Sequence, residues 1–177
     1  MTICVFASSS QDLDPRYNEA AKQLGRLIAS QGHTLVNGAG STGLMRHVSD
    51  GALDAGGRVV GIIPKFMVDK RLDYDRLQEV VVTADMHQRK QMMQQMSDAI
   101  VALPGGVGTL EELLEAITWR QLKLIDKPII LLNTLNYFDP LADMLSQAAR
   151  QGFMKTCHTS LYALAETPDE VMSLLNE

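Results

Sequence analysis

Short apolar runs alternate with longer amphipathic segments along the whole chain. The short runs are rich in Val, Ile and Ala, which is typical of strands buried on both faces of a parallel sheet. They predict strands at residues 2–7, 34–36, 58–63, 79–83, 99–103, 129–132 and, as an edge strand, 161–164. Between these runs apolar residues recur every three or four positions, which predicts helices at 15–30, 44–55, 85–96, 110–124, 138–151 and 169–176.

This alternation predicts the fold class. We expect the 177 residues to form one α/β domain over 1–177, a doubly wound parallel sheet with helices on both faces in a three-layer αβα arrangement. Ligands of such sheets bind beyond the carboxyl ends of the strands. The loops at those ends are therefore where the chemistry is expected.

Three of these loops carry candidate binding residues, and we expect them to converge. The loop at 8–10 consists of serines, and the loops at 38–43 and 105–109 are rich in glycine. Together they predict a phosphorylated or nucleotide-like ligand. The charged segment 65–76 shows no clear period and is interpreted as a mobile loop near the mouth of the site.

The stretch Pro-Gly-Gly-x-Gly-Thr-x-x-Glu at 104–112 is the most specific signal in the chain. Pro104 ends a strand, and we expect Gly105, Gly106 and Gly108 to adopt positive φ and to let the backbone approach a ligand closely. A helix then begins, and the bare N–H groups at its start favour phosphate. The alternative is a tight turn that needs glycine for its shape alone.

Thr109 and Glu112 have a second interpretation. Their spacing also fits a capping box, in which Thr109 bonds the amide of residue 112 and Glu112 bonds the amide of Thr109. A capping residue at the rim of a phosphate loop still faces the ligand, so both readings stay open.

The segment Met-His-x-Arg-Lys at 86–90 is the second informative motif. Arg89 shares a helix face with Met86, Met93 and Met96, which we expect to face the core. A buried arginine needs an anionic partner, so this position favours a charged ligand or an acid. The alternative is an arginine that extends from the rim of the core to water.

Composition and spacing exclude several classes of function. A net charge of −5 from 16 basic and 21 acidic residues argues against nucleic-acid binding, and no apolar run approaches the length of a membrane span. Cys4 and Cys157 are expected to be reduced packing residues of a cytoplasmic protein. The four histidines lack the spacing of metal ligands, so no metal is expected.

Other nucleotide and hydrolase motifs fit poorly. The sequence at 38–43 matches Gly-x-Gly-x-x-Gly, but the acid that would bind a dinucleotide ribose about 20 residues later is missing. The chain also lacks the Gly-Lys-Ser/Thr of a P-loop and the Gly-x-Ser-x-Gly of a serine hydrolase.

The two motifs at 86–90 and 104–112, with supporting segments at 4–9, 38–45 and 117–122, resemble the Lonely Guy family. The resemblance implies a Rossmann-like homodimer that takes a nucleoside 5′-monophosphate as its small-molecule substrate. It would hydrolyse the N-glycosidic bond and release a cytokinin or adenine base and ribose 5-phosphate, without a cofactor. Arg46 departs from the family, which commonly has glycine there, and this departure bears on which base is preferred.

The resemblance also implies the site. Arg89 and Glu112 match the catalytic arginine and glutamate, and a carboxylate beside the anomeric carbon suits a reaction that builds positive charge on the ribose. With the serine and glycine loops, the expected substrate- and phosphate-binding residues are Ser8, Ser9, Gly38, Gly40, Met86, Lys90, Gly105, Gly106, Val107, Gly108, Thr109, Glu111 and Thr118. Phe66, Tyr74 and Trp119 are the candidates for stacking on the base.

Three alternatives remain beside this enzyme. Similar sequences have been labelled lysine decarboxylases, but that reaction needs pyridoxal phosphate on a Schiff-base lysine, and nothing in the chain indicates one. Some relatives of this architecture bind molybdenum cofactor, so a non-catalytic nucleotide or cofactor carrier is the main alternative. An NAD(P)-dependent reductase is the third, and it predicts nicotinamide binding.

Overall fold

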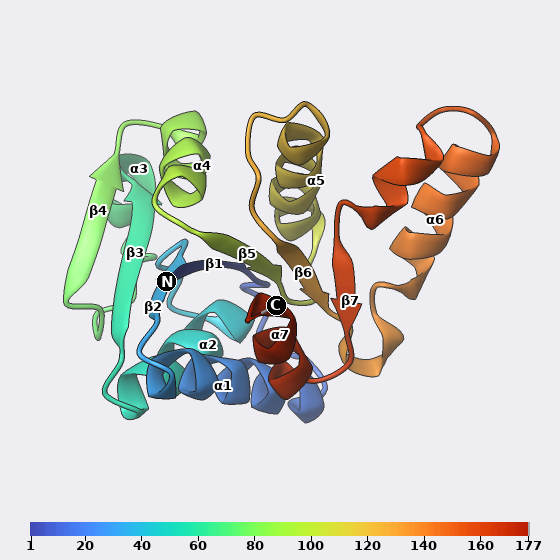
Figure 1. The fold of residues 1–177 in the computed structure, drawn as a ribbon. Coiled ribbons are helices and arrows are strands. Elements are labelled where there is room, and N and C mark those ends of the chain that lie inside the picture. Colours follow the sequence, from blue (N-terminus) through green and yellow to red (C-terminus); the bar gives the residue numbers. More distant parts are fainter. Residues whose placement is uncertain (177) are drawn as a thin grey trace.

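The computed structural model describes residues 1–176, which contain one seven-stranded parallel sheet (Figure 1). The strand order is β4-β3-β2-β1-β5-β6-β7. The strands are β1 (Thr2–Phe6), β2 (Thr34–Asn37), β3 (Arg58–Pro64), β4 (Glu79–Thr83), β5 (Ala99–Ala102), β6 (Ile129–Leu132) and β7 (Ala163–Ala165). The predicted α/β fold with a doubly wound sheet is confirmed.

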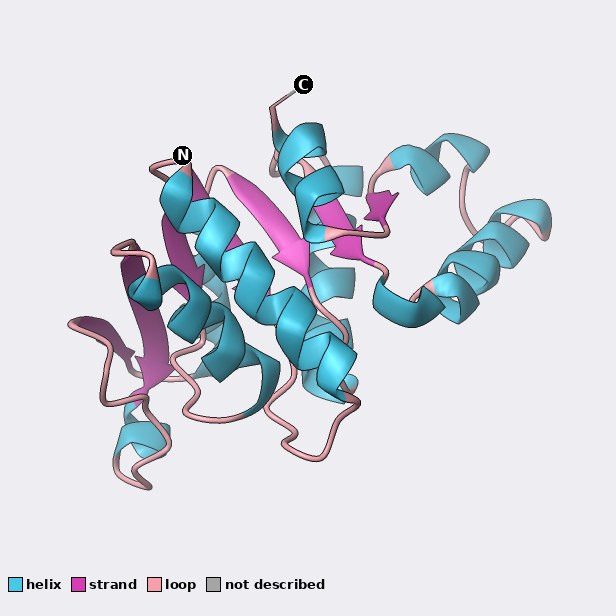
Figure 2. Cartoon of the chain, turned by 90° about the horizontal axis from the view of Figure 1, so that it is seen from below, coloured by secondary structure: helices cyan, strands magenta, loops and turns pink. Residues whose placement is uncertain are grey.

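Helices cover both faces of the sheet (Figures 1 and 2). They are α1 (Pro15–Ser30), α2 (Gly43–Asp54), α3 (Lys65–Val68), α4 (Met86–Gln95), α5 (Val107–Gln121), α6 (Asp139–Arg150) and α7 (Pro168–Leu175), with short 3₁₀ turns η1 (Thr134–Asn136) and η2 (Thr156–Ser160). In Figure 1, α1, α2 and α7 lie on one face, α4 and α5 lie on the other, and α6 lies beside β7 at the edge.

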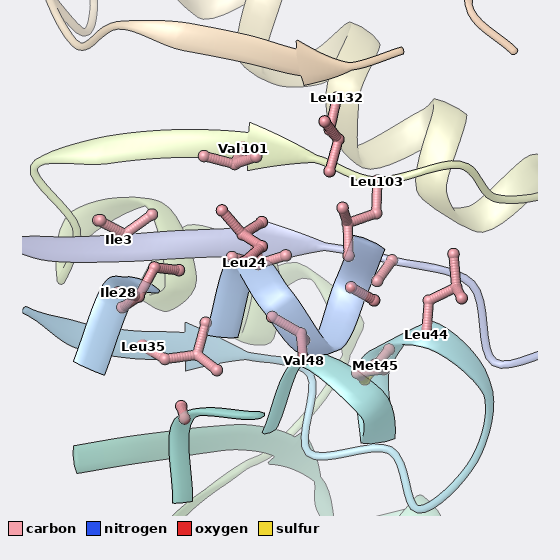
Figure 3. Close-up of a cluster of buried hydrophobic side chains, with 14 of the residues drawn as sticks. Ile3, Leu24, Ile28, Leu35, Leu44, Met45, Val48, Val101, Leu103 and Leu132 are labelled. Carbon is pink, nitrogen blue, oxygen red and sulfur yellow. The ribbon is translucent and has the colours of Figure 1, made fainter. Parts of the chain in front are cut away.

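The strand side chains alternate between two apolar cores. Ile3 and Val5 of β1 point into the core shared with α1 and α2, which Figure 3 shows around Leu24. Cys4 and Phe6 point into the core beneath α4 and α5. Because both faces of the strand are buried, β1 reads as one apolar run, as the sequence pattern predicted.

The chain switches direction at the centre of the sheet. From β1 the chain proceeds through β2, β3 and β4 toward one edge, and from β5 through β6 and β7 toward the other. The loops that follow β1 and β5 therefore leave adjacent strands in opposite directions. Such a switch point opens a crevice at the carboxyl edge of the sheet, which is the usual ligand position in this fold class.

Several local predictions need correction. Segment 65–76 is not without structure, because it contains α3 and a bridge from Asp73 to Gly40. Met96 is 39% exposed rather than part of the core, since it lies at the end of α4. Cys4 is buried as predicted, whereas Cys157 lies exposed in η2 and is not a buried packing residue. Among residues 1–176, no helix has both the length and the apolar character to cross a membrane.

Candidate active site

The carboxyl ends of the central strands surround a cavity of about 460 Å³. This volume lies within the usual range for small-molecule sites. The lining residues are Ala7, Ser8, Ser9, Ser10, Gly38, Gly40, Ser41, Thr42, Met45, Met67, Leu72, Arg89, Gly106, Val107, Gly108, Thr109 and Glu112. The serine loop and both glycine loops thus meet at one cavity, as expected from their positions after β1, β2 and β5.

Hydrogen bonds hold the serine loop between the two glycine loops. The Ser8 amide donates to the Pro104 carbonyl at 3.3 Å, and the Ser8 carbonyl accepts from the Met45 amide at 3.1 Å. The Thr42 hydroxyl donates to the Ser9 carbonyl at 2.8 Å. The three loops therefore form one connected rim.

The first turn of α5 presents free amides to this rim. The helix begins at Val107 after Gly106, and no side chain caps its amino end. The first amides of a helix have no partner within the helix, and the helix dipole adds partial positive charge there. Because Gly106, Gly108 and Thr109 line the cavity, this end of α5 has the geometry that favours an anion.

The glycines of the loop at 105–109 leave room for a ligand to approach the backbone closely, and they do not adopt positive φ. None of the three is among the described glycines with positive φ, so that expectation was wrong. A side chain on Gly105 would overlap Thr109, whereas a methyl group on Gly106 or Gly108 would meet nothing within 4 Å. The backbone at Gly106 and Gly108 is therefore bare toward the cavity.

The interpretation of Thr109 and Glu112 as a capping box is also wrong. Because α5 starts at Val107, Thr109 lies inside the first turn instead of before it. Thr109 is buried and lines the cavity. Glu112 faces Arg89 and not the amide of Thr109.

Arg89 reaches inward and not to water, which excludes the extended rim arginine. It is 5% exposed, and its Nε donates to the Ile62 carbonyl at 3.1 Å while Nη2 donates to the Gly38 carbonyl at 3.3 Å. Its Nη1 lies 3.5 Å from Glu112 Oε1. A side chain on Gly38 would overlap the guanidinium, so the glycine provides the space that Arg89 occupies.

Glu112 is the acid of the cavity. It is 8% exposed, and this burial raises its pKa above the usual value, although Arg89 opposes the shift. Charges interact more strongly in such a poorly solvated site than in water. A carboxylate here can stabilise positive charge that develops on a bound ligand, and it can accept a proton.

Five of the predicted binding residues do not line this cavity. Met86 contacts Arg89 through its sulfur, 3.8 Å from Nη1. Gly105 lies behind the loop, where its carbonyl accepts a hydrogen bond from the Tyr137 hydroxyl at 2.5 Å. Lys90 is 8% exposed, and its Nζ links α4 to α5 by pairing with Glu111 Oε1 at 2.5 Å.

Glu111 and Thr118 instead line a second, shallower groove on the outer face of α5. It has a volume of about 450 Å³, and its other lining residues are Val107, Leu110, Leu114 and Glu115. Val107 lines both spaces and is 86% exposed. The outer groove therefore begins at the mouth of the cavity.

The motifs did not indicate the apolar part of the cavity. Met67 and Leu72 come from segment 65–76, whose charged residues indicated only a position near the site mouth. Met45, the third apolar side chain, ends the supporting segment 38–45 but was not among the predicted binding residues. None of the stacking candidates, Phe66, Tyr74 or Trp119, lines the cavity.

Comparisons with known proteins show the family to which the chain belongs. The model of a family described as possible lysine decarboxylase matches residues 45–175. The chain is 45% identical to cytokinin riboside 5′-monophosphate phosphoribohydrolase LOG3 of Arabidopsis thaliana, over 99% of this chain and 81% of that protein. It is 42% identical to the probable cytokinin riboside 5′-monophosphate phosphoribohydrolase LOGL2 of Oryza sativa subsp. japonica, over 99% and 72%.

Among solved structures, the molybdenum cofactor binding protein from the phototrophic bacterium Rippkaea orientalis is similar in fold. It aligns with a TM-score of 0.74 and 28% identity, over 99% of this chain and 94% of that chain. The name of the family model does not fit the cavity, because the lining residues, all within 1–176, include no lysine to form a Schiff base with pyridoxal phosphate. Sequence identity above 40% over nearly the whole chain, with the two motifs at and beside the cavity, places the chain in the Lonely Guy family of cytokinin riboside 5′-monophosphate phosphoribohydrolases.

Proposed function

We propose that this protein hydrolyses the N-glycosidic bond of adenosine 5′-monophosphates, including N6-modified ones, to the free base and ribose 5-phosphate. The observation that carries the proposal is the pairing of a buried acid with a free helix start in one cavity. Glu112 and the first turn of α5 both line it. The names of the relatives support the same reaction class.

The 5′-phosphate binds at the amino end of α5. Charge-assisted hydrogen bonds from the amides of residues 107–109 contribute roughly 1.5–3 kcal/mol each. Ser8 and Ser9 face the phosphate from the neighbouring loop. Because Glu112 lies one turn further along the same helix, anchoring the phosphate also fixes the ribose relative to the acid.

Glu112 acts on the anomeric carbon. As the bond from C1′ to the base nitrogen breaks, its electron pair leaves with the base and positive charge grows on the ribose. The Glu112 carboxylate stabilises that charge and takes a proton from the water that attacks C1′. Glu112 passes this proton to the departing base, so the products are the neutral base and ribose 5-phosphate and the carboxylate is regenerated. Arg89, held by two backbone carbonyls, keeps Glu112 ionised and oriented.

The direct test is base release. Purified protein is incubated with AMP and with isopentenyladenosine monophosphate, and free base is measured by chromatography. We expect Glu112→Gln to lower kcat by at least about 10², the lower part of the range for general acid–base catalysis. Glu19→Gln, on the exposed side of α1 and outside both the cavity and the outer groove, is the matched control and keeps activity within about threefold.

A carrier makes the opposite prediction. The likeness to a molybdenum cofactor binding protein makes a non-catalytic carrier the second candidate. A carrier retains its ligand in a one-to-one ratio and releases no base from any monophosphate. That result with intact folding, or full activity of Glu112→Gln, contradicts the proposed reaction or the role of Glu112.

The site also includes a second copy of the chain. The outer groove of α5 is apolar at Val107, Leu110 and Leu114, and Leu114 is 39% exposed. A homodimer that pairs through this face removes these side chains from water. It also explains why Glu111 and Thr118, both expected to bind substrate, lie on the outer side of α5.

The cytoplasmic location expected from the sequence stays a prediction.

A further inference from the structure

Three side chains form an apolar wall in the cavity. Met45 comes from α2, and Met67 and Leu72 come from segment 65–76 between β3 and β4. We call these three residues the apolar wall. The rest of the lining is polar or glycine-rich apart from Ala7 and Val107. The wall therefore offers the contact surface suited to a flat, weakly polar base.

Backbone hydrogen bonds join segment 65–76 to the glycine loop at 38–43. The Ser41 amide donates to the Leu72 carbonyl at 3.2 Å, and the Tyr74 amide donates to the Ala39 carbonyl at 2.9 Å. Asp73 pairs with Gly40 between these bonds. Leu72 is thus positioned by its own bond to Ser41 and by the bonds of the two residues that follow it.

A side-chain cluster centred on Asp50 secures the same end of the segment. The Asp50 carboxylate accepts hydrogen bonds from the Tyr74 hydroxyl and from Arg76 Nη1, both at 2.5 Å. Arg46 Nε lies 3.4 Å from the same carboxylate, and its guanidinium lies over the Tyr74 ring, 5.6 Å from the centroid. Arg76 also bonds Asp54 at 2.9 Å. We call Asp50, Tyr74, Arg76 and Arg46 the Asp50 cluster.

The Asp50 cluster lies outside the cavity and separate from the end where the phosphate is proposed to bind. None of its four members lines the cavity. Tyr74 is nevertheless buried, and the Asp50 side chain is only 14% exposed. Both ends of the cluster are connected to the apolar wall, because Asp50 lies on the helix that carries Met45 and Tyr74 lies two residues after Leu72.

We propose that Asp50 and Tyr74 are positioning residues for the base of the substrate, which they serve by holding Leu72, and through the bond from the Leu72 amide to the Met67 carbonyl at 3.1 Å also Met67, against it. This inference rests on the proposed function, because it assumes that the phosphate lies at α5. The two ends of the substrate are then bound independently. The Asp50 cluster affects ligands that contain a base and has no effect on ribose 5-phosphate, which has none.

The test compares two ligands in Tyr74→Phe and Asp50→Asn. We expect KM for AMP to rise at least about fivefold and kcat to stay within about twofold, because Arg89 and Glu112 are untouched. We expect the inhibition constant of ribose 5-phosphate to stay within about twofold. Hydrogen exchange followed by mass spectrometry should show faster exchange in 65–76 and unchanged exchange in the strands.

Glu79→Gln is the matched control, because it breaks the Arg58–Glu79 ion pair without touching segment 65–76. It should change neither the KM for AMP nor the inhibition constant of ribose 5-phosphate. The inference is overturned if AMP and ribose 5-phosphate weaken equally, or if AMP affinity is unchanged in both variants. Calorimetry with AMP and ribose 5-phosphate gives the same contrast without turnover. A wild-type protein that binds both ligands and releases no base therefore contradicts the proposed function alone.

Discussion

At the scale of single residues, the site depends on two buried charges that stabilise each other. Glu112 alone in this position would be strongly desolvated, and Arg89 alone would leave a buried cation without a partner. Their 3.5 Å separation is long for a tight ion pair. Arg89 therefore holds the Glu112 carboxylate without neutralising its charge, and the carboxylate remains available to a ligand.

The raised pKa of Glu112 predicts the pH dependence of turnover. Burial raises this pKa above its ordinary value of 4.5, so the carboxyl becomes protonated at a higher pH than an exposed glutamate. If the ionised form is the active one, kcat at saturating AMP falls as pH decreases through the raised pKa. The measurement is kcat against pH, with circular dichroism at each pH to confirm folding. A kcat that instead falls only as pH rises assigns Glu112 as an acid.

Gly38 sets the position of Arg89. We expect Gly38→Ala to displace the guanidinium and lower kcat/KM at least about tenfold, because small displacements of catalytic groups are costly. The physical reason is tested by a double-mutant cycle on the free energy of unfolding. Gly38→Ala should destabilise the wild type more than it destabilises Arg89→Ala, where the clash is absent. Equal destabilisation in both backgrounds would show that the methyl group acts elsewhere.

At the scale of elements, the sequence predicted strands better than helix starts. Each central strand is buried on both faces, so Ile3 to Phe6 form an uninterrupted apolar run that is easy to recognise. Apolar periodicity predicts a helix from Leu110, whereas α5 begins at Val107. Free amides at a helix start, with glycine in place of a capping side chain, leave no signal in that periodicity.

The same reasoning explains what was missed in the site. Local motifs identified Arg89, Glu112 and the glycine loop because close backbone approach and buried charge restrict residue choice. Leu72 is placed by long-range bonds to Ser41 and by Tyr74, and no local pattern encodes them. Adjacent residues on a helix point about 100° apart, so Glu112 faces the cavity while Glu111 faces outward, a difference that spacing alone did not reveal.

At the scale of the whole molecule, the charge distribution suits a small anion held by dipoles. The chain carries a net charge of −5, and Arg89 is the one cation among the cavity-lining residues within 1–176. Arg89 is already engaged by Glu112. In the proposed function the amides of α5 supply most of the attraction for a phosphate, and the parallel sheet fixes their direction by placing α5 after the central strand β5.

The exposed apolar face of α5 predicts the oligomeric state. If two copies pair through Val107, Leu110 and Leu114, Leu114→Glu places a charge in the interface, and burying an unpaired charge costs several kcal/mol. Light scattering with size-exclusion chromatography should then show a dimer for the wild type and a monomer for Leu114→Glu. Val82→Glu, on the exposed edge strand β4, is the matched control and should remain dimeric. If Glu111 and Thr118 complete the partner's site, the Leu114→Glu monomer also loses base release while its own cavity stays folded, whereas a fully active monomer would place the complete site within one chain.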